Sequence, residues 1–354
     1  MRQPNKQRLY PKLLLLLLIG LLLNACMGFP NQTSPQDQSS SPNISGSGRQ
    51  GIQVFVEPDA GIQPITLAIQ AAQHSIWVEM YLLSNKKVIR ALEEASNRGL
   101  DVRVMLELHP YGGGIVASQT LDKLQLAGVK VEGSNPAFAL THEKSMLIDG
   151  SIAFIMTSNF TNSALGGRST IQNREYDLVD TNPEDVQSVI SIFNADWNRH
   201  GVQLEDPNIV ASPLNARRNF IALIDSTRQS LLIEAEEMQD TSVEQALVLT
   251  ARRGVSIQVI LPASSSGTSD SNSAGITRLR QSGIVVREDQ RLYMHAKMMV
   301  ADGRLAFVGS ENISAASLDR NRELGLMIAD HQVISQLQKT FQLDWADSTL
   351  VQVR

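Results

Sequence analysis

The sequence predicts an α/β fold of two similar lobes, each a mostly parallel or mixed β-sheet flanked by helices, packed with pseudo-symmetry. Short apolar segments alternate with helical segments, which is typical of βα units. The same order of segments occurs twice, 155 residues apart, as in Ser75–Glu79 and Ser230–Glu234. A His-x-Lys-x4-Asp motif is also present twice, and we expect each lobe to contribute one copy.

The chain begins with a predicted lipoprotein signal peptide, residues 1–25. Basic residues precede an apolar run of eleven residues from Leu13 to Leu23, which is short for a membrane span. The run ends in Leu-Asn-Ala before Cys26, which resembles a bacterial lipobox and makes Cys26 the expected lipidation site. Ordinary cleavage, or a retained anchor with a free thiol, is the alternative. Because Cys26 is the single cysteine, disulfides are excluded.

Residues 26–50 are expected to form a disordered tether. They consist mainly of Ser, Gln, Asn, Pro and Gly, and such a segment buries too little apolar surface to offset the entropy lost on ordering. The expected location is therefore the cell envelope, with the protein exported and anchored to a membrane as a bacterial lipoprotein.

The part that follows the signal peptide is acidic. Without the four basic residues of the leader, 27 Lys and Arg remain against 36 Asp and Glu, which leaves a net charge of about −9. Nucleic acids are bound through clustered positive charge, so a generic affinity for them is disfavoured.

The two lobes are expected at residues 51–205 and 206–354, and they share the order of their elements. The strands expected at Ser75–Glu79 and Ser230–Glu234 each precede a helix that ends at an Arg-Gly pair, Arg98-Gly99 or Arg253-Gly254. Glycine in the left-handed conformation ends a helix, and a buried strand is expected next. These two strands are Val102–Leu106 and Ile257–Leu261.

A helical pattern with a repeated Phe-x-x-Asp-Trp ends each lobe, at Phe193–Trp197 and Phe341–Trp345. Residues four apart share one face of a helix. We therefore predict that these aromatic residues pack in the core and do not form a site.

The chemistry is predicted at the two His-x-Lys pairs. Side chains at positions i and i+2 of a strand point to the same face. In each pair, His142 with Lys144 and His295 with Lys297, the imidazole and the ammonium would therefore bind one anion.

Each pair is followed by a predicted hairpin turn. Asp149-Gly150 and Asp302-Gly303 favour a two-residue turn, which would place His142 opposite Thr157 and His295 opposite Ser310. Asp149 and Asp302 are candidates for the active site, but holding the turn is the role we favour for them over direct catalysis.

An Asn-x-Glu motif follows each hairpin, as Asn173-Arg174-Glu175 and Asn321-Arg322-Glu323. A histidine that acts near neutral pH needs its second ring nitrogen oriented and its charge tuned, and a carboxylate does both. Glu175 and Glu323 are the candidates for this role.

These motifs together resemble the phospholipase D superfamily, and the resemblance covers both lobes. It is carried by the duplicated His-x-Lys-x4-Asp, the Thr/Ser-x-Asn that follows it, and Asn-x-Glu. The second copy, with Gly309-Ser310-Glu311-Asn312, matches the family closely. The first departs from it, with Met156-Thr157 in place of Gly-Ser and extra residues around Gly166-Gly167-Arg168.

The resemblance implies a single active site between the lobes that cleaves a phosphodiester without a metal or other cofactor. One neutral imidazole attacks phosphorus to give a phosphohistidine, while the opposite imidazolium protonates the leaving alkoxide. His142 is the expected nucleophile and His295 the acid, with the reverse assignment left open. Lys144 and Lys297 hold the non-bridging oxygens. The residues expected to assist in binding the phosphate are Thr157, Asn159, Ser310 and Asn312.

A metal hydrolase is disfavoured by the spacing of the histidines and acids. The sequence has no His-x-x-x-His pair, no cysteine cluster and no calcium-loop ladder. An ammonium inside each motif is also a poor neighbour for a bound cation.

The expected function is a phospholipase D-type phosphodiesterase, a hydrolase or transphosphatidylase of phospholipids at the membrane that anchors it. An exported endonuclease is the alternative, with a basic cleft supplied by Arg168, Arg174, Arg320 and Arg322. A non-catalytic scaffold that binds anionic headgroups is disfavoured by the two complete His-Lys pairs.

Overall fold

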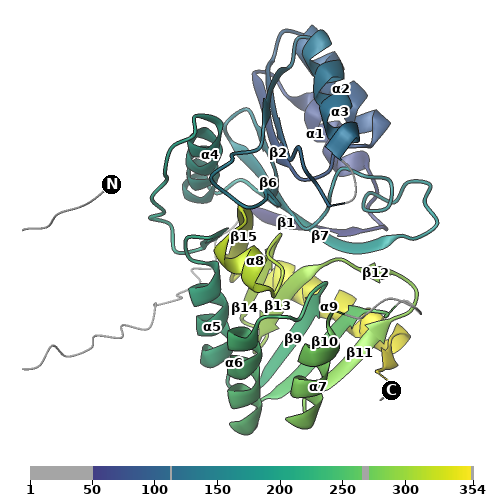
Figure 1. Ribbon diagram of the computed structural model, residues 1–354, viewed down its shortest axis with the longest axis vertical. Helices are drawn as coiled ribbons and strands as arrows, with labels where there is room; N and C mark the ends of the chain where they lie inside the picture. The colour runs from purple at the N-terminus through teal and green to yellow at the C-terminus, as the bar shows by residue number, and fades with distance from the viewer. Residues whose placement is uncertain (1–50, 112–113, 265–270, 352–354) are drawn as a thin grey trace, which may run out of the picture. The chain divides into compact units, whose positions relative to one another are not determined.

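The computed structural model describes residues 51–111, 114–264 and 271–351. The predicted signal peptide, the tether and Cys26 lie outside these residues. Within them, two eight-stranded sheets are each flanked by helices (Figure 1), which confirms the predicted fold class. None of the helices in the described ranges is both long and apolar enough to cross a bilayer.

The first sheet has the strand order β1-β7-β6-β5-β2-β3-β4. Its strands are β1 (Ile52–Glu57), β2 (Ser75–Met80), β3 (Asp101–Leu106), β4 (Lys130–Gly133), β5 (Lys144–Ile148), β6 (Ile152–Met156) and β7 (Asn173–Asp180). The helices of this lobe are α1 (Gln63–Ala71), α2 (Lys86–Asn97), α3 (Gly114–Leu126) and α4 (Pro183–Trp197). The eighth strand, β12 (Tyr293–Met294), lies outside this order and pairs in parallel with β7. Strands β2, β3 and β4 also run parallel to one another, and the remaining pairings are antiparallel.

The second sheet has the strand order β16-β11-β10-β9-β13-β14-β15-β8. Its strands are β8 (Ile209–Ser212), β9 (Ser230–Ala235), β10 (Ser256–Pro262), β11 (Val285–Asp289), β13 (Lys297–Ala301), β14 (Leu305–Gly309), β15 (Glu323–Ile328) and β16 (Thr349–Leu350). The helices are α5 (Ala216–Ser226), α6 (Thr241–Arg252), α7 (Ser273–Gln281), α8 (Ala315–Asp319) and α9 (His331–Asp347). Here β9, β10 and β11 form the parallel part.

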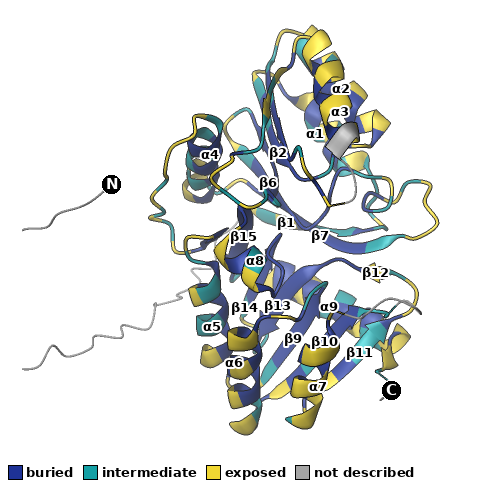
Figure 2. Ribbon diagram, viewed as in Figure 1, coloured by how far each residue is buried: buried dark blue, intermediate teal, exposed yellow. Residues whose placement is uncertain are grey.

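Each sheet is buried on both faces, and one core is shared between the lobes. Helices α1 to α3 pack on one sheet and α5 to α7 on the other, each group over its own apolar cluster. A third cluster combines residues of both sheets, such as Ile155 and Leu178 with Val308 and Leu326, together with α4 and α9. Figure 2 shows the buried strands against the exposed outer sides of α2, α6 and α7.

The ends of the predicted helices lie where glycine permits them. Helix α2 ends at Asn97 and α6 at Arg252, and the glycines that follow, Gly99 and Gly254, have φ of 91° and 89°. This left-handed backbone is accessible to glycine without steric cost. The strands that follow are β3 and β10, as predicted.

The predicted hairpin register is wrong by one residue in both lobes. The turn itself closes as expected, since Ser151 N donates to Ile148 O at 3.0 Å. The ladder, however, pairs Ile148 with Ile152, so Ser151 is an extra residue that shifts β6 along β5. Arg304 is the extra residue of the second hairpin. Thr157 and Ser310 are therefore not directly opposite the histidines.

The lobes also exchange short backbone segments next to the motifs. Strand β12 (Tyr293–Met294) belongs to the second half of the chain but pairs with β7 of the first, with Met294 beside Arg174. Thr141 makes the matching bridge to Arg322. Each motif histidine thus enters beside the Asn-Arg-Glu segment of the other lobe.

The repeated Phe-x-x-Asp-Trp motifs pack as predicted. Phe193 stacks on Trp197, and Phe341 on Trp345, with both pairs of ring centroids 5.6 Å apart. The aspartate of each motif has a further contact that the sequence reasoning missed, because it binds an arginine of the opposite lobe.

Candidate active site

The first half of the site is built at the start of β5. His142 lies just before the strand, and its Nδ1 is 2.9 Å from Oε2 of Glu323. Lys144 is the first residue of β5, is fully buried, and donates a hydrogen bond to the backbone oxygen of His142. The ring of Tyr81 lies edge-on to His142, with centroids 4.6 Å apart.

The second half repeats this arrangement at the start of β13. His295 Nδ1 lies 2.8 and 2.9 Å from the two carboxylate oxygens of Glu175. Lys297 donates to the backbone oxygen of His295 at 2.6 Å and to Oε2 of Glu236 at 2.9 Å. Both side chains are buried.

The pairing of histidine and glutamate is crossed between the lobes. His142 and Glu175 come from the first lobe, whereas Glu323 and His295, their respective partners across the site, come from the second. The backbone bridges beside the two Asn-Arg-Glu segments bring this about. The sequence identified both glutamates, but the spacing along the chain carries no information about which lobe each would serve.

The two glutamates are held in turn by hydroxyl and amide groups. Thr157 donates to Glu175 and Ser310 to Glu323, both at 2.7 Å. These hydroxyls therefore orient the two carboxylates that face the histidines, and their role in binding phosphate stays a prediction. Asn173 at 2.9 Å and Asn321 at 3.2 Å donate to the same two carboxylates.

The two asparagines of the Thr/Ser-x-Asn motif differ in their contacts. Asn159 accepts from Leu82 N through its Oδ1 at 3.2 Å. Asn312 donates through Nδ2 to Glu236 at 3.2 Å, and its Oδ1 is buried without a hydrogen-bond partner. Asn312 is thus one of the donors that surround Glu236.

Burial favours the uncharged forms of His142 and Lys144 in the first half of the site. It lowers the pKa of His142, with Glu323 opposing the change and Lys144 adding to it. It also lowers the pKa of Lys144 to about 7, mainly because the ammonium is removed from water. His142 is therefore available as a neutral base or nucleophile at pH 7.

Asp149 and Asp302 lie at the turns of the hairpins, at the far ends from the histidines, and their carboxylates bind backbone N–H groups. Asp302 accepts hydrogen bonds from the N–H groups of Arg228, Gln229 and Ser230 at 2.7 to 3.0 Å. Asp149 does the same for residues 73–75. Both have positive φ, 51° and 52°. Neither contacts a motif histidine or lysine, which supports the turn-holding role.

Two of the arginines proposed to line a basic cleft are instead buried between the lobes. Arg174 binds Asp344 at 2.6 and 2.7 Å, and Arg322 binds Asp196 at 2.6 Å. The expectation for these two residues is wrong, because their charges are neutralised within the fold. Arg168 and Arg320 are exposed.

Glu236 is the site residue that the sequence reasoning missed. It follows β9 and occupies the place that Tyr81 has in the first copy, 155 residues earlier. Because the two residues differ, the comparison of repeats gave no signal. The available signal was its position two residues beyond Glu234 at the end of a buried strand, where α/β proteins place ligands.

One group of acids among the described residues is close enough to hold a metal ion, Glu79, Glu143 and Asp196. It is buried next to Arg322, which already pairs with Asp196. Burial raises the pKa of Glu143 to about 7 and that of Glu79 well above its usual value. The group is therefore enclosed in the fold and already contains one arginine as a counter-charge.

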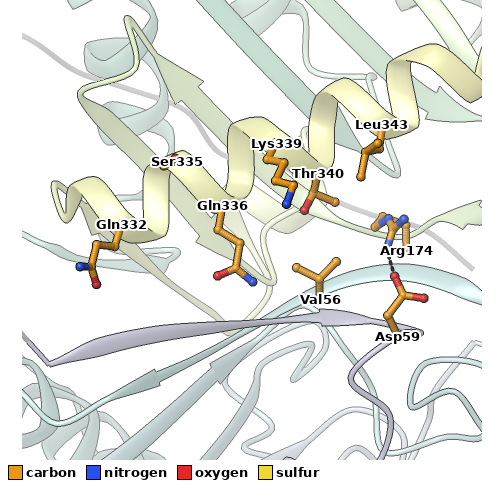
Figure 3. Close-up of a pocket in the computed structure, with 9 residues that line it drawn as sticks. All are labelled: Val56, Asp59, Arg174, Gln332, Ser335, Gln336, Lys339, Thr340 and Leu343. Carbon is orange, nitrogen blue, oxygen red and sulfur yellow. Dashed lines mark ion pairs between the residues drawn. The ribbon is translucent and has the colours of Figure 1, made fainter.

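A groove of about 510 Å³ lies elsewhere, between β1 and α9 (Figure 3). It is lined by Val56, Asp59 and Arg174 on one side and by polar residues of α9, such as Gln336 and Lys339, on the other. None of the motif histidines or lysines lines it. The groove is therefore separate from the site described above.

Comparison with known proteins yields one family and several relatives. The family model described as "Cardiolipin synthase, PLD-like domain" matches residues 65–197 and 220–345, well over half of the chain. A cardiolipin synthase of Clostridium perfringens is 21% identical over 352 residues, covering 86% of this chain and 72% of the relative. A probable cardiolipin synthase of Bacillus subtilis is 23% identical, covering 85% of this chain and 67% of the relative.

Solved structures share the fold. The phosphatidylserine synthase of Haemophilus influenzae aligns with a TM-score of 0.66 at 15% identity, covering 86% of this chain and 88% of that one. The polyphosphate kinase of Porphyromonas gingivalis aligns with a TM-score of 0.67 at 16% identity, covering 84% of this chain and 48% of that one.

Proposed function

The chain belongs to the cardiolipin synthase, PLD-like domain family, and on that premise we propose that it transfers phosphatidyl groups between phospholipids through a phosphohistidine. The observation that carries the proposal is the crossed pairing of each motif histidine with the glutamate of the other lobe. This pairing requires both lobes to complete either half-site. It therefore supports one shared site with two histidines and two lysines.

In the first step, Nε2 of His142 attacks the phosphorus of the donor lipid. A P–N bond forms, the P–O bond to the headgroup breaks, and Nε2 of His295 gives its proton to the leaving oxygen. The neutral state favoured by the buried surroundings of His142 supports its role as the nucleophile. Glu323 fixes its ring by accepting a hydrogen bond from Nδ1–H.

In the second step, an acceptor hydroxyl gives its proton to Nε2 of His295 as its oxygen bonds to phosphorus. The P–N bond then breaks and His142 is released as a neutral ring. Lys144 and Lys297 supply positive charge to the non-bridging oxygens in both steps. Binding of an anionic phosphate beside Lys144 would favour its charged form, because an opposite charge opposes the effect of burial.

An alcohol is the proposed main acceptor, and water a secondary one. The relatives at 21 to 23% identity are named cardiolipin synthases, which favours the hydroxyl of a second phospholipid. Release of phosphatidic acid by water would be hydrolysis at the same phosphohistidine. The buried state of Arg174 and Arg322 removes support from the endonuclease alternative.

We also propose that the enzyme works at the membrane that anchors it through a lipid on Cys26. The proposal rests on the signal-like leader and the polar tether that follows it. A Cys26→Ser variant, expressed in the native host, is expected to leave the membrane fraction. Retention of the variant in that fraction would contradict lipid anchoring.

The function is tested with the full chain in detergent micelles of phosphatidylglycerol, in the presence of EDTA. Mass spectrometry of the lipids is expected to show cardiolipin, with a smaller amount of phosphatidic acid. His142→Ala and His295→Ala should abolish both products, whereas His331→Ala, at an exposed position of α9, should retain them. Plasmid DNA is assayed in parallel.

The outcomes separate the candidate functions. Phosphatidic acid without cardiolipin would identify a hydrolase, and nicked DNA without lipid products an endonuclease. No turnover of either substrate, or a loss of activity that EDTA alone produces, would contradict the proposal.

A further inference from the structure

The two half-sites differ at one position beside the reactive histidine. Tyr81 and Glu236 occupy the same place in the repeat, 155 residues apart. In the first half-site the ring of Tyr81 faces His142 and lies 5.3 Å from Nζ of Lys144. In the second, a carboxylate takes the place of the ring.

The carboxylate of Glu236 lies among donors on the reactive side of His295. Its Oε2 accepts from Lys297 Nζ at 2.9 Å and from Asn312 Nδ2 at 3.2 Å, and lies 3.5 Å from His295 Nε2. Its Oε1 accepts from the hydroxyl of Tyr293 at 3.0 Å. Burial alone would raise its pKa, but the neighbouring His295 and Lys297, together with the hydrogen bond from Lys297, hold that pKa well below the usual value. Glu236 is therefore ionised at neutral pH.

His295 consequently faces a carboxylate at each ring nitrogen. Glu175 lies at Nδ1 and Glu236 at Nε2. A neutral imidazole has only one N–H, whereas the imidazolium has two and a positive charge that both carboxylates attract. Lys297 Nζ lies 3.3 Å from Nδ1 and opposes that charge, and Glu236 lies at ion-pair distance from Nε2. His142 differs, because within the described ranges its Nδ1 faces Glu323 and no hydrogen bond or ion pair is made by its Nε2.

We propose that Glu236 is a positioning residue that gives the reaction its direction, by holding a proton on Nε2 of His295 while Tyr81 leaves Nε2 of His142 free to attack. The inference deepens the proposed function and rests on it. When the donor lipid binds, its leaving oxygen replaces Glu236 as the partner of Nε2 and takes the proton. The P–O bond then breaks as the P–N bond to His142 forms.

The charges around the two rings agree with this direction. The titratable groups that face His295 are Glu175 from β7, Glu236 after β9, Tyr293 from β12 and Lys297 from β13, with His142 and Lys144 of the other half-site beyond them. Two carboxylates against one adjacent ammonium favour the cationic ring. His142 has Glu323 at its Nδ1 and the uncharged Tyr81 beside its ring. Burial lowers its pKa, and two ammonium groups, Lys144 and Lys297, lower it further. Glu236 also interacts with His142 electrostatically, without a hydrogen bond or ion pair between the two among the described residues.

The test is the protonation state of both histidines in the resting full chain, measured by NMR with ¹⁵N-labelled histidine between pH 5 and 9. Variants His142→Gln and His295→Gln assign the signals. At pH 7 the wild type is expected to carry protons on both nitrogens of His295 and on Nδ1 alone of His142. Glu236→Gln should lower the pH at which His295 loses its second proton by about one to three units.

Two further variants separate this role from a structural one. Glu205→Gln makes the same change at an exposed position outside the site, and its histidines should titrate as in the wild type. Glu236→Asp keeps the negative charge, so the pH at which His295 deprotonates should lie between those of Glu236→Gln and the wild type. In the phosphatidylglycerol assay, Glu236→Gln should move the basic limb of the pH–rate profile to lower pH, whereas mere collapse of the site would lower the rate equally at every pH.

The proposal is overturned if His295 is neutral at pH 7 in the wild type, or if Glu236→Gln leaves its titration unchanged. Neither result needs turnover, because the resting enzyme is observed. Failure of the proposed function would appear separately, as the absence of lipid products from a wild type whose histidines titrate as expected.

Discussion

Asp302 illustrates how a residue inside a catalytic motif can serve the backbone alone. Its carboxylate binds three N–H groups at the start of β9. Burial would raise its pKa, but these donors hold the pKa below its usual value. We expect Asp302→Asn to lower the free energy of unfolding by about 1–2 kcal/mol, with kcat nearly unchanged. Urea denaturation and the lipid assay measure the two quantities, and a large loss of kcat in a stable variant would show that Asp302 takes part in the chemistry.

The crossed glutamates predict a different outcome for each half-site. Glu323 serves the nucleophile His142, and Glu175 serves the acid His295. With phosphatidylglycerol, Glu323→Gln and Glu175→Gln are each expected to lower kcat by about 10²–10⁴-fold. A p-nitrophenyl phosphodiester has a leaving group that needs little protonation. With this substrate, kcat of Glu175→Gln should return toward the wild-type value, whereas kcat of Glu323→Gln should stay low.

The control for this prediction is Glu205→Gln, at an exposed position, which should match the wild type with both substrates. Recovery of Glu323→Gln in place of Glu175→Gln would show that the roles of the histidines are reversed.

At the scale of single residues, the sequence sufficed for those side chains that are repeated. The histidines, lysines and Asn-x-Glu carboxylates were found because two copies make chance spacing improbable. Glu236 was missed because it breaks the repeat. The crossing was missed because hydrogen bonds between lobes depend on how the sheets pack and not on spacing along the chain.

At the scale of elements, buried ion pairs tie each lobe's Asn-Arg-Glu strand to the last helix of the other lobe. Arg322, beside β15, binds Asp196 of α4, which lies close to Glu79 and Glu143. Removing the guanidinium would leave Asp196 without its ion-pair partner and the acidic group without its buried cation. We expect Arg322→Gln to lower the free energy of unfolding by about 3–5 kcal/mol in urea denaturation.

A matched substitution on the surface provides the control. Arg90 pairs with Glu94 one turn along α2, and both side chains are exposed. Arg90→Gln should cost less than about 0.5 kcal/mol. Equal effects of the two substitutions would mean that the buried pair contributes no more than an exposed one.

Element boundaries were predicted well where local chemistry decides them. The Arg-Gly pairs ended both helices because glycine accepts a positive φ. The hairpin register was not predictable from the Asp-Gly turn, because the extra residues Ser151 and Arg304 shift the ladder after a normal turn bond. Such a bulge has no residue type of its own that the sequence would reveal.

At the scale of the whole molecule, buried carboxyl groups make stability depend on pH. Burial raises the pKa of Glu57 and Asp185 to about 8 and that of Glu143 and Asp177 to about 7. These groups stay protonated in the folded chain at pH values where the unfolded chain ionises them. Their contribution to the free energy of unfolding is complete below about pH 4 and is lost as the pH rises toward 7 or 8. His142 is one group whose pKa is lowered, and its contribution to stability changes with pH in the opposite direction.

We therefore expect the free energy of unfolding to fall between pH 5 and 7. Each such carboxyl contributes about 1.4 kcal/mol per pH unit. Asp177→Asn should flatten the dependence by about that amount, because its partner Ser158 can bond to an amide as well. Urea denaturation at several pH values measures the slope. Stability that rises over this range would show that the buried acids are ionised in the folded chain.

The duplication was the strongest predictor of the architecture. Repetition at a constant offset gave two lobes and the order of strands and helices, and the two sheets follow it. The shared core and the exchange of β12 were beyond sequence reasoning, since apolar strands indicate burial without naming the surface that covers them.

The central claim is that both halves close on one phosphorus atom. A crystal structure of the full chain soaked with vanadate, which mimics phosphoryl transfer, tests it most directly. We expect a single vanadate between Nε2 of His142 and Nε2 of His295, with Lys144 and Lys297 on its oxygens. Two separate ions, or one bound by a single half-site with the other histidine out of reach, would contradict the claim.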